Sequence, residues 1–299
     1  MADNDLAIKV QNVSKKYGSL SALDNISFTI KKGEIVSIIG KNGAGKTTIM
    51  KLVVGLIYPT SGTIIVFNNN PDYIKQRVSV LFEDNYLYPN LSGLDNLILA
   101  CNEIKTTTEE MLRTLDKFSL SKRLLSSKAS AFSHGQGRRL LLAATILRKP
   151  DLFLLDEPFN GIDYEGINAL RETMIVEREK GKSFLVTGQN LSYLADIVDR
   201  VIYIDKGRVI YDGEVSGIKY IVPGNIVIEV NEPSKFTSFL LSKDIKFLTK
   251  DANRFFLQAT LLKAKEIKEE ALKQGIKFSK FNFTSIEDGG QINEDLNKE

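Results

Sequence analysis

The sequence predicts an α/β fold over about residues 1–217, followed by a small α+β domain. Two observations support this prediction. From Leu6 to Gly217, short apolar runs typical of buried strands alternate with helical segments. After Pro223-Gly224, the pattern changes to strand, helix, strand, strand, helix, strand. A chain of 299 residues with 43% hydrophobic content is long enough for one large or two ordinary domains with real cores.

The first part of the chain contains eight apolar runs that we expect to be strands. The section between Ser92 and Leu147 has no clear strand pattern and predicts several helices. We therefore expect a helical subdomain at about residues 92–147. The expected strands are Ile8–Val13, Ser27–Ile30, Glu34–Ile39, Thr63–Phe67, Val78–Phe82, Leu152–Asp156, Phe184–Thr187 and Val201–Asp205.

The C-terminal part has the βαββαβ order of a split-βαβ, ferredoxin-like domain, which we place at residues 218–288. The many charges on its second helix favour a solvated surface over a binding patch. Residues 289–299 have little to bury, and we expect a disordered tail. The expected elements are Ile226–Val230, Ser234–Leu241, Ile245–Leu248, Arg254–Leu257, Leu261–Gln274 and Ile276–Phe283.

The segment Gly40–Thr48 fits a phosphate-binding loop between the strand Glu34–Ile39 and a helix expected at Thr47–Val54. Its glycines let backbone N–H groups turn toward phosphates, and the positive end of the helix faces the same anion. A glycine-rich turn without a ligand is the alternative. The sequence therefore predicts that a nucleoside triphosphate and Mg²⁺ are bound, with Lys46 on the β- and γ-phosphates, Thr47 on the metal, and contacts from Gly40, Lys41, Asn42, Gly43, Ala44, Gly45 and Thr48.

Two carboxylates, Asp156 and Glu157, end the apolar strand that begins at Leu152. Phosphoryl transfer needs an anchor for the metal and a group that takes a proton from water. We expect Asp156 to hold Mg²⁺ and Glu157 to be the general base. In isolation, the same pair could be a helix N-cap in a loop.

Three further segments extend the pattern. They are Ala131–Arg139 shortly before the acidic strand, Asn160–Asp163 after it, and Tyr17 before Gly18. In order and spacing, residues 6–217 resemble the nucleotide-binding subunit of ATP-binding cassette (ABC) transporters. The resemblance implies that two chains hold ATP between the phosphate loop of one and the signature motif of the other. It assigns Ser133, His134, Gly135 and Gln136 to that motif, Asp163 to the dimer interface, and Tyr17 to adenine stacking.

Three positions depart from the family pattern. Glu83 stands where the family has glutamine, Gln189 where it has histidine, and His134 where the signature usually has its first glycine. A carboxylate at Glu83 can still ligate Mg²⁺ but adds negative charge, and Gln189 cannot carry the charge of an imidazolium. His134 is a nucleotide-binding residue with a catalytic role, or else a tolerated side chain that points away from the nucleotide. With Glu157, Gln189 and Glu83 as catalytic candidates, we expect good ATP binding and slow hydrolysis by the chain alone.

Composition limits the partners. A net charge of +3 does not by itself argue for nucleic acid or a membrane surface, and we expect no nucleic-acid partner. The single Cys101 and the absence of a signal peptide at the start predict a cytoplasmic location. The longest apolar run, Leu140–Leu147, is too short to span a bilayer. The resemblance implies a peripheral protein on the cytoplasmic face of the membrane, held by a separate transmembrane permease and paired in a homo- or heterodimer.

Two features bear on the branch of the family. The C-terminal domain and Glu83 resemble bacterial exporter subunits for drugs and antimicrobial peptides, so we expect export of a peptide, drug or lipophilic substrate. The segment Tyr86-Leu87-Tyr88 predicts a docking surface, or else fills space between core and helical subdomain. The alternatives are a degenerate regulatory ABC ATPase with low turnover and a soluble, non-transport ABC ATPase. Glu157 argues against the first, and the single phosphate loop without a heptad run argues against the second.

Overall fold

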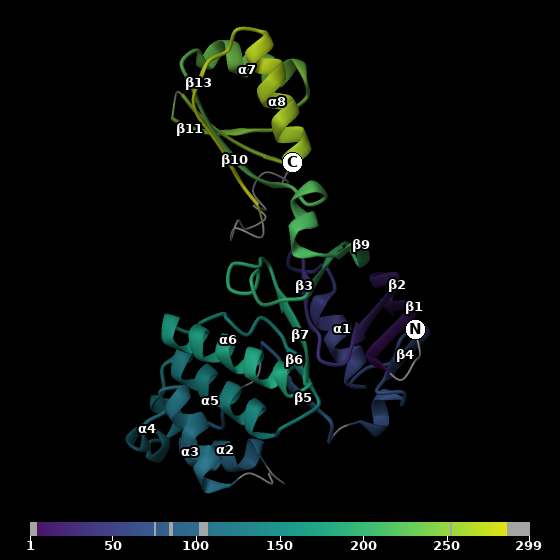
Figure 1. The fold of residues 1–299 in the computed structure, drawn as a ribbon, viewed down its shortest axis with the longest axis vertical. Coiled ribbons are helices and arrows are strands. Elements are labelled where there is room, and N and C mark those ends of the chain that lie inside the picture. Colours follow the sequence, from purple (N-terminus) through teal and green to yellow (C-terminus); the bar gives the residue numbers. More distant parts are fainter. Residues whose placement is uncertain (1–4, 75, 84–85, 102–106, 252, 286–299) are drawn as a thin grey trace.

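The computed structural model describes residues 5–74, 76–83, 86–101, 107–251 and 253–285. Figure 1 shows a larger part with two sheets and most of the helices, and a smaller part built from β10–β13 with two helices. The predicted α/β fold is confirmed. No helix of the described part is both long and apolar enough to cross a membrane.

The central sheet has six strands and positions the site. Its order is β5-β6-β7-β3-β8-β9, parallel except for β9, which runs antiparallel to β8. Parallel sheets are buried on both faces, and β3 and β6 contain only buried residues. The strands are β3 (Ile35–Ile39), β5 (Val78–Leu81), β6 (Leu152–Leu155), β7 (Ser183–Gly188), β8 (Arg200–Asp205) and β9 (Arg208–Gly213).

A second, antiparallel sheet covers one face of the central sheet. Its order is β2-β1-β4, from β1 (Leu6–Tyr17), β2 (Leu20–Lys31) and β4 (Ser61–Val66). Helix α1 (Lys46–Val53) shares one hydrophobic cluster with both sheets. A short 3₁₀ turn, η2 (Pro71–Tyr73), follows β4.

Helices cover the other face of the central sheet, and the predicted helical subdomain is confirmed within the described residues. Alternate residues of β6 and β7, such as the stacked rings of Phe153 and Phe184, point into this helical layer. Reciprocal capping boxes start α2, α3 and α5. The helices are α2 (Gly93–Ala100), α3 (Thr108–Lys117), α4 (Lys122–Ser126), the 3₁₀ turn η3 (Ala129–Ala131), α5 (His134–Leu147) and α6 (Tyr164–Glu179).

The C-terminal sheet is antiparallel in the order β11-β12-β10-β13, and the predicted βαββαβ order is confirmed. Its helices pack with the sheet around a core of its own, in which the ring of Phe236 meets those of Phe239, Phe255 and Phe278. The elements are β10 (Gly224–Val230), α7 (Pro233–Ser242), β11 (Leu248–Asp251), β12 (Arg254–Ala259), α8 (Leu261–Lys273) and β13 (Phe278–Thr284).

Two expected strand starts in this sheet were wrong. Ile245 and Ile276 were expected to begin strands. Their N–H groups instead donate to the carbonyl oxygens of Leu240 and Ala271, at the C-terminal ends of the preceding helices. The strands therefore start later, at Leu248 and Phe278. β9 was not expected, because its apolar run Val209-Ile210-Tyr211 is short and its residues alternate between exposed and partly buried.

The segment between the two parts is the 3₁₀ turn η4 (Val215–Tyr220). Ile218 and Val222 are buried in the same cluster as the helical layer of the central sheet. The boundary expected at residue 217 stays a prediction, and the expected tail at 289–299 lies outside the described residues.

Phe236 offers a test of the C-terminal core. The side chain is fully buried, so Phe236→Ala leaves a cavity among three rings, and we expect the free energy of unfolding to fall by about 3–5 kcal/mol. Urea unfolding followed by circular dichroism measures the loss. Leu262→Ala is the control, because Leu262 of α8 is 60% exposed and the expected change is within about 0.5 kcal/mol. Equal effects of the two substitutions would contradict this description of the core.

Candidate functional site

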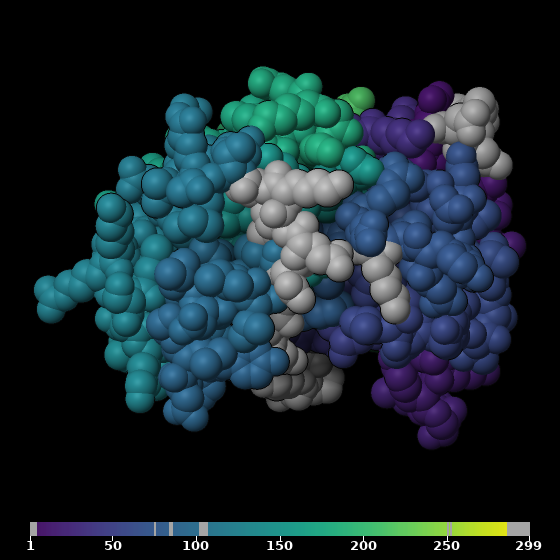
Figure 2. All heavy atoms as spheres, turned by 90° about the horizontal axis from the view of Figure 1, so that it is seen from below, coloured from purple at the N-terminus to yellow at the C-terminus, as the bar shows by residue number. Residues whose placement is uncertain are grey.

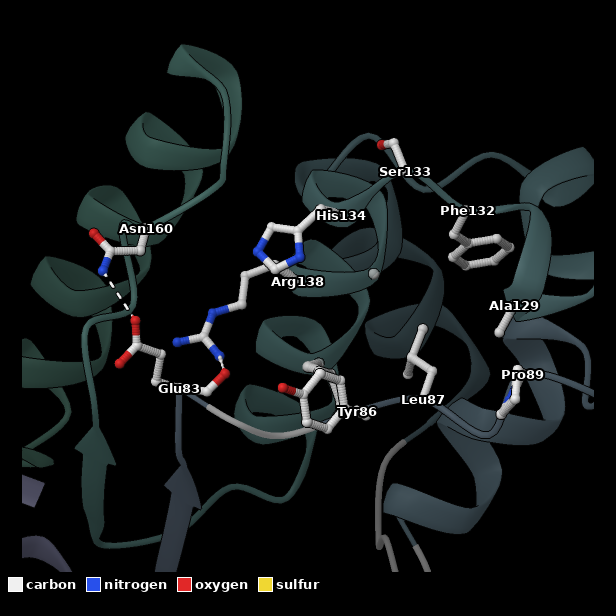
Figure 3. A pocket seen from close by; sticks show the side chains of 12 residues that line it. Glu83, Tyr86, Leu87, Pro89, Ala129, Phe132, Ser133, His134, Arg138 and Asn160 are labelled. Atoms are coloured by element: carbon white, nitrogen blue, oxygen red, sulfur yellow. Dashed lines mark hydrogen bonds between the residues drawn. The ribbon is translucent and has the colours of Figure 1, made fainter.

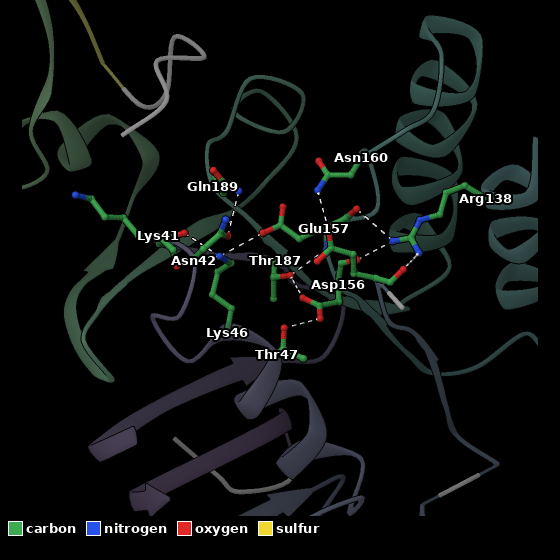
Figure 4. Close-up of polar contacts among 12 residues, drawn as sticks. Lys41, Asn42, Lys46, Thr47, Arg138, Asp156, Glu157, Asn160, Thr187 and Gln189 are labelled. Atoms are coloured by element: carbon green, nitrogen blue, oxygen red, sulfur yellow. Dashed lines mark hydrogen bonds and ion pairs between the residues drawn. The ribbon is translucent and has the colours of Figure 1, made fainter. Parts of the chain in front are cut away.

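The carboxyl ends of the parallel strands bring the chemically important loops together (Figure 4). The phosphate loop follows β3, Glu83 follows β5, Asp156 and Glu157 follow β6, and Gln189 follows β7. This edge is where open α/β sheets bind their ligands. The structure thus gathers residues that lie up to about 150 positions apart in the sequence.

Two glycines of the phosphate loop are required by close approach. A Cβ on Gly40 would lie 2.3 Å from the carbonyl oxygen of Ile204. Gly45 has a φ of +110°, and a Cβ there would lie 2.6 Å from a methyl carbon of Leu23. Gly45 precedes α1 without any side-chain cap, so the first N–H groups of this helix remain for an anion.

Lys46 is buried at the centre of the loop. Its ammonium donates to the carbonyl oxygens of Gly40 at 2.8 Å and Lys41 at 3.3 Å. It also forms an ion pair with Glu157 Oε1 at 3.2 Å. These contacts hold the Lys46 ammonium within the phosphate loop. A bound triphosphate would compete with Glu157 for this ammonium.

Asp156 is 1% exposed, and its carboxylate joins the end of β6 to helix α1 and to strand β7. Thr47 donates its hydroxyl to one carboxylate oxygen at 2.8 Å, and the hydroxyl of Thr187 donates to the other. Hydroxyl and carboxylate oxygens are ligands that suit Mg²⁺. Among the described residues, no three acidic, histidine or cysteine side chains cluster as a metal site. A cation at Thr47 and Asp156 would therefore complete its shell with phosphate oxygens and water.

Glu157 has the environment of a general base. Burial raises the pKa of its carboxyl group, Lys46 opposes that shift, and the charges of Asp156 and Glu83 add to it. Its backbone has a positive φ of 47°, and its N–H donates to the hydroxyl of Thr187 at 3.1 Å. A raised pKa brings a carboxylate closer to the value that proton transfer at neutral pH requires.

The signature segment begins α5. The hydroxyl of Ser133 accepts from the N–H of Gln136 at 3.2 Å, and the Gln136 side chain accepts from the N–H of Ser133 at 3.0 Å. A Cβ on Gly135 would lie 2.9 Å from the carbonyl oxygen of Gly161. The His134 ring is exposed but lies against the same Gly161, because a Cβ there would be 2.3 Å from the ring. Its side chain thus contacts the Asn160–Asp163 loop.

Of the remaining predicted site residues Gln189, Asp163 and Tyr17, the first is hydrogen-bonded to the phosphate loop. Gln189 reaches the phosphate loop, since its amide donates to Asn42 Oδ1 at 3.1 Å. Asp163 instead caps α6 by accepting from Gly166 at 3.1 Å and pairs with Arg139. Tyr17 ends β1 with its ring 46% exposed. Within the described residues, no hydrogen bond or ion pair joins Ser133–Gln136 to the phosphate loop.

Three residues of the site were missed by the sequence reasoning. Thr187 bridges Asp156 and Glu157, and Asn160 donates to Glu83 Oε1 at 3.4 Å. Arg138, 4% exposed, donates to backbone carbonyls of both acidic loops. Arg138 stands in the signature segment, but nothing in a sequence shows which carbonyls a buried guanidinium will meet.

A pocket of about 360 Å³ opens beside Glu83 (Figure 3). Polar groups of Glu83, His134, Arg138 and Asn160 line one side. The other side is largely apolar and includes Tyr86, Leu87, Pro89, Ala129, Phe132 and Leu141. Seen from the end opposite the C-terminal sheet, the helical subdomain and the part around α1 and β4 form two lobes (Figure 2).

The backbone of the loop that carries these aromatic residues is hydrogen-bonded to Asn96 at Tyr88. The buried side chain of Asn96 accepts from the N–H of Tyr88 at 2.7 Å and donates to its carbonyl oxygen at 3.0 Å. Tyr86 and Tyr88 are nevertheless 79% and 65% exposed. The alternative considered from the sequence, that these residues fill space, was therefore wrong for the two tyrosines, whereas Leu87 is partly buried and packs against the helical layer.

Comparison with known proteins agrees with this geometry. The family model described as "ABC transporter" matches residues 23–160. The lantibiotic transport ATP-binding protein SrtF of Streptococcus pyogenes is 34% identical over 70% of this chain and 92% of its own length. The bacitracin transport ATP-binding protein BcrA of Bacillus licheniformis is 32% identical over 68% of both chains.

A solved structure has the same fold. The dimeric post-hydrolysis state of the ATP-binding cassette MJ0796, bound to ADP and Pi, superimposes with a TM-score of 0.62 at 26% identity. The match covers 70% of this chain and 98% of that one. From its motifs, its fold and these relatives, we conclude that the chain belongs to the ABC transporter family as an ATP-binding subunit.

Proposed function

We propose that this subunit hydrolyses ATP to drive a membrane exporter of a peptide, drug or other lipophilic substrate. It would work in a nucleotide-sandwich dimer with a separate membrane subunit. The observation that carries the proposal is the contact set among Lys46, Thr47, Asp156 and Glu157 at the sheet's carboxyl edge. The names of SrtF and BcrA, which refer to lantibiotic and bacitracin transport, favour a peptide-like substrate.

Each residue of this set has a defined role in the proposed reaction. Lys46 exchanges its pairing with Glu157 for the β- and γ-phosphates. Thr47 and Asp156 would hold Mg²⁺, which would neutralise charge on the phosphates. Glu157, released from Lys46, takes the proton from the attacking water. Thr187 keeps the backbone of Glu157 next to Asp156 during this exchange.

A second chain completes the site in this proposal. The N–H groups of His134 and Gly135 in the first turn of α5 and the hydroxyl of Ser133 would form an anion site. Among the described residues, no hydrogen bond or ion pair joins this site to the phosphate loop of the same chain. The dimeric ADP- and Pi-bound relative supports an arrangement in which two cassettes face each other. The nucleotide then has different contact energies in the closed and open dimers, which makes it a switch.

The membrane partner would dock at the pocket beside Glu83. Aromatic side chains are enriched at protein interfaces, so the exposed Tyr86 and Tyr88 suit such a surface, and the Tyr88 backbone is anchored by Asn96. Glu83 lies in the pocket wall and follows β5, so it connects this surface to the nucleotide edge. Through such a permease, the subunit would lie on the cytoplasmic face of the membrane.

Lys46→Ala tests nucleotide binding. Because the ammonium would meet two phosphates, we expect ATP affinity, measured by isothermal titration calorimetry, to fall at least about tenfold. Lys51→Ala, an exposed lysine of the same helix, is the matched control and should bind as the unmodified chain does. Unchanged affinity in Lys46→Ala would refute the assignment of the loop.

Glu157→Gln tests the general base. We expect the hydrolysis rate to drop by about 10²–10⁴-fold while ATP is still bound. The retained ATP should drive pairing of chains, visible by sedimentation. Glu179→Gln, on the exposed end of α6, removes a carboxylate without touching the site and should keep the rate. Ordinary turnover by Glu157→Gln would exclude this role.

Gln189→His tests the expected slow turnover. The glutamine amide reaches the phosphate loop but brings no positive charge. An imidazolium at this position should stabilise the transition state, and we expect kcat to rise roughly tenfold, more at pH 6 than at pH 8. The measurement is steady-state ATPase activity of the purified subunit. High turnover by the unmodified chain, unaffected by Gln189→His, would contradict the expectation.

A further inference from the structure

Arg138 is a buried cation, and within the part of the chain that the structure describes its hydrogen bonds all go to backbone carbonyls. Its Nη1 donates to the carbonyl oxygens of Phe82 at 2.8 Å and Glu83 at 3.3 Å. Its Nη2 donates to those of Asp156 at 2.8 Å and Glu157 at 3.2 Å. One guanidinium therefore fastens the end of β5 to the end of β6 (Figure 4).

Burying the Arg138 guanidinium costs desolvation free energy that packing alone would not require. Burial lowers the pKa of the Arg138 guanidinium, and the charges of Glu83, Asp156 and Glu157 only oppose that shift. Its Nε has no hydrogen-bond partner, and no carboxylate of the described residues lies within ion-pair distance. An apolar side chain would fill the same space without this desolvation, so its placement serves the two loops that it holds.

The position of Arg138 on α5 connects it to the signature segment. The helix runs without interruption from His134 to Leu147, and its N-cap is Ser133. Arg138 follows that cap by about one and a half helical turns. Its neighbours Leu140, Leu142 and Ala143 are buried, so the helix is fixed in the core and its start moves together with the guanidinium.

We propose that Arg138 is a positioning residue that couples the two nucleotide sites of the sandwich within each chain. The inference depends on the proposed dimer. In that dimer, Ser133 contacts the nucleotide held by the partner, whereas Glu157 acts on the nucleotide held by its own chain. Arg138 joins the helix that starts at Ser133 to the loop that carries Glu157. When the site around the partner's nucleotide closes on Ser133, Arg138 therefore aligns Glu157 with the nucleotide of its own chain.

The Arg138 guanidinium also contacts the pocket beside Glu83, where we propose that the permease docks. Arg138 lines the pocket beside Glu83 and bonds to the Glu83 carbonyl, so a partner seated there contacts the same unit. Arg138 touches neither the reacting phosphates nor the metal ligands' side chains. Its effect should therefore appear in kcat and in cooperativity, with ATP binding to the single chain largely unchanged.

The experiment compares two substitutions with a matched control in the full-length chain. Arg138→Lys keeps the charge, but one ammonium cannot reach both pairs of carbonyls, and Arg138→Met removes all four bonds. Arg200→Lys makes the same change in another partly buried arginine, which pairs with Glu34 and Asp212 at the opposite edge of the sheet. Urea unfolding measures how far each variant is destabilised.

The readouts separate coupling from simple loss of structure. For the unmodified chain we expect a Hill coefficient for ATP hydrolysis of ~1.5 or more. For Arg138→Lys and Arg138→Met we expect kcat to fall roughly 10–100-fold, the Hill coefficient to fall to about 1, and single-chain ATP affinity to change less than about threefold. Arg200→Lys should lose stability but keep the Hill coefficient.

Two results would overturn the inference. One is a folded Arg138→Lys chain that keeps its kcat and Hill coefficient. The other is an Arg200→Lys chain that loses cooperativity to the same degree. Sedimentation of Glu157→Gln with ATP and Mg²⁺ tests the dimer separately. A dimer without cooperativity in the unmodified chain refutes the coupling alone, whereas the absence of any dimer refutes the proposed function.

Discussion

The carboxylate of Asp156 is the contact on which the geometry of the site depends. It accepts hydrogen bonds from Thr47, 109 residues earlier, and from Thr187, 31 residues later. A buried carboxylate without partners would be strongly destabilising, so the fold must bring both hydroxyl groups to it. Meeting that requirement aligns the phosphate loop, the acidic loop and the end of β7, and it leaves two oxygens of the kind that Mg²⁺ binds.

The charges around this contact explain why a phosphate ligand suits the site. Lys46 and Arg138 are both buried, and the carboxylates of Asp156 and Glu157 compensate part of their charge. Glu157 is raised in pKa by burial and lowered by Lys46, so its basicity depends on where the lysine ammonium lies. A triphosphate that attracts Lys46 would therefore raise the pKa of Glu157, the proposed general base, when it binds.

Two arginines hold the central sheet together at opposite edges. Arg138 ties the ends of β5 and β6 beneath the nucleotide edge, whereas Arg200 ties the starts of β3 and β8 to β9. The C-terminal sheet has a separate phenylalanine-rich core, and η4 connects it to the helical layer through Ile218. The site residues named above all lie in the first part of the chain, before η4.

The sequence by itself determined the phosphate loop, the acidic pair, the helical subdomain and the βαββαβ order. These features depend on local patterns: glycine spacing, apolar periodicity and capping residues act within a few positions. Tertiary structure decided the contacts of Arg138, Thr187 and Asn160, because their partners lie 18 to 77 residues away. It also moved the starts of β11 and β13, since backbone N–H groups that a strand would use instead close the preceding helices. Periodicity reports which face of an element is apolar, and only the folded chain decides which buried donor meets which carbonyl.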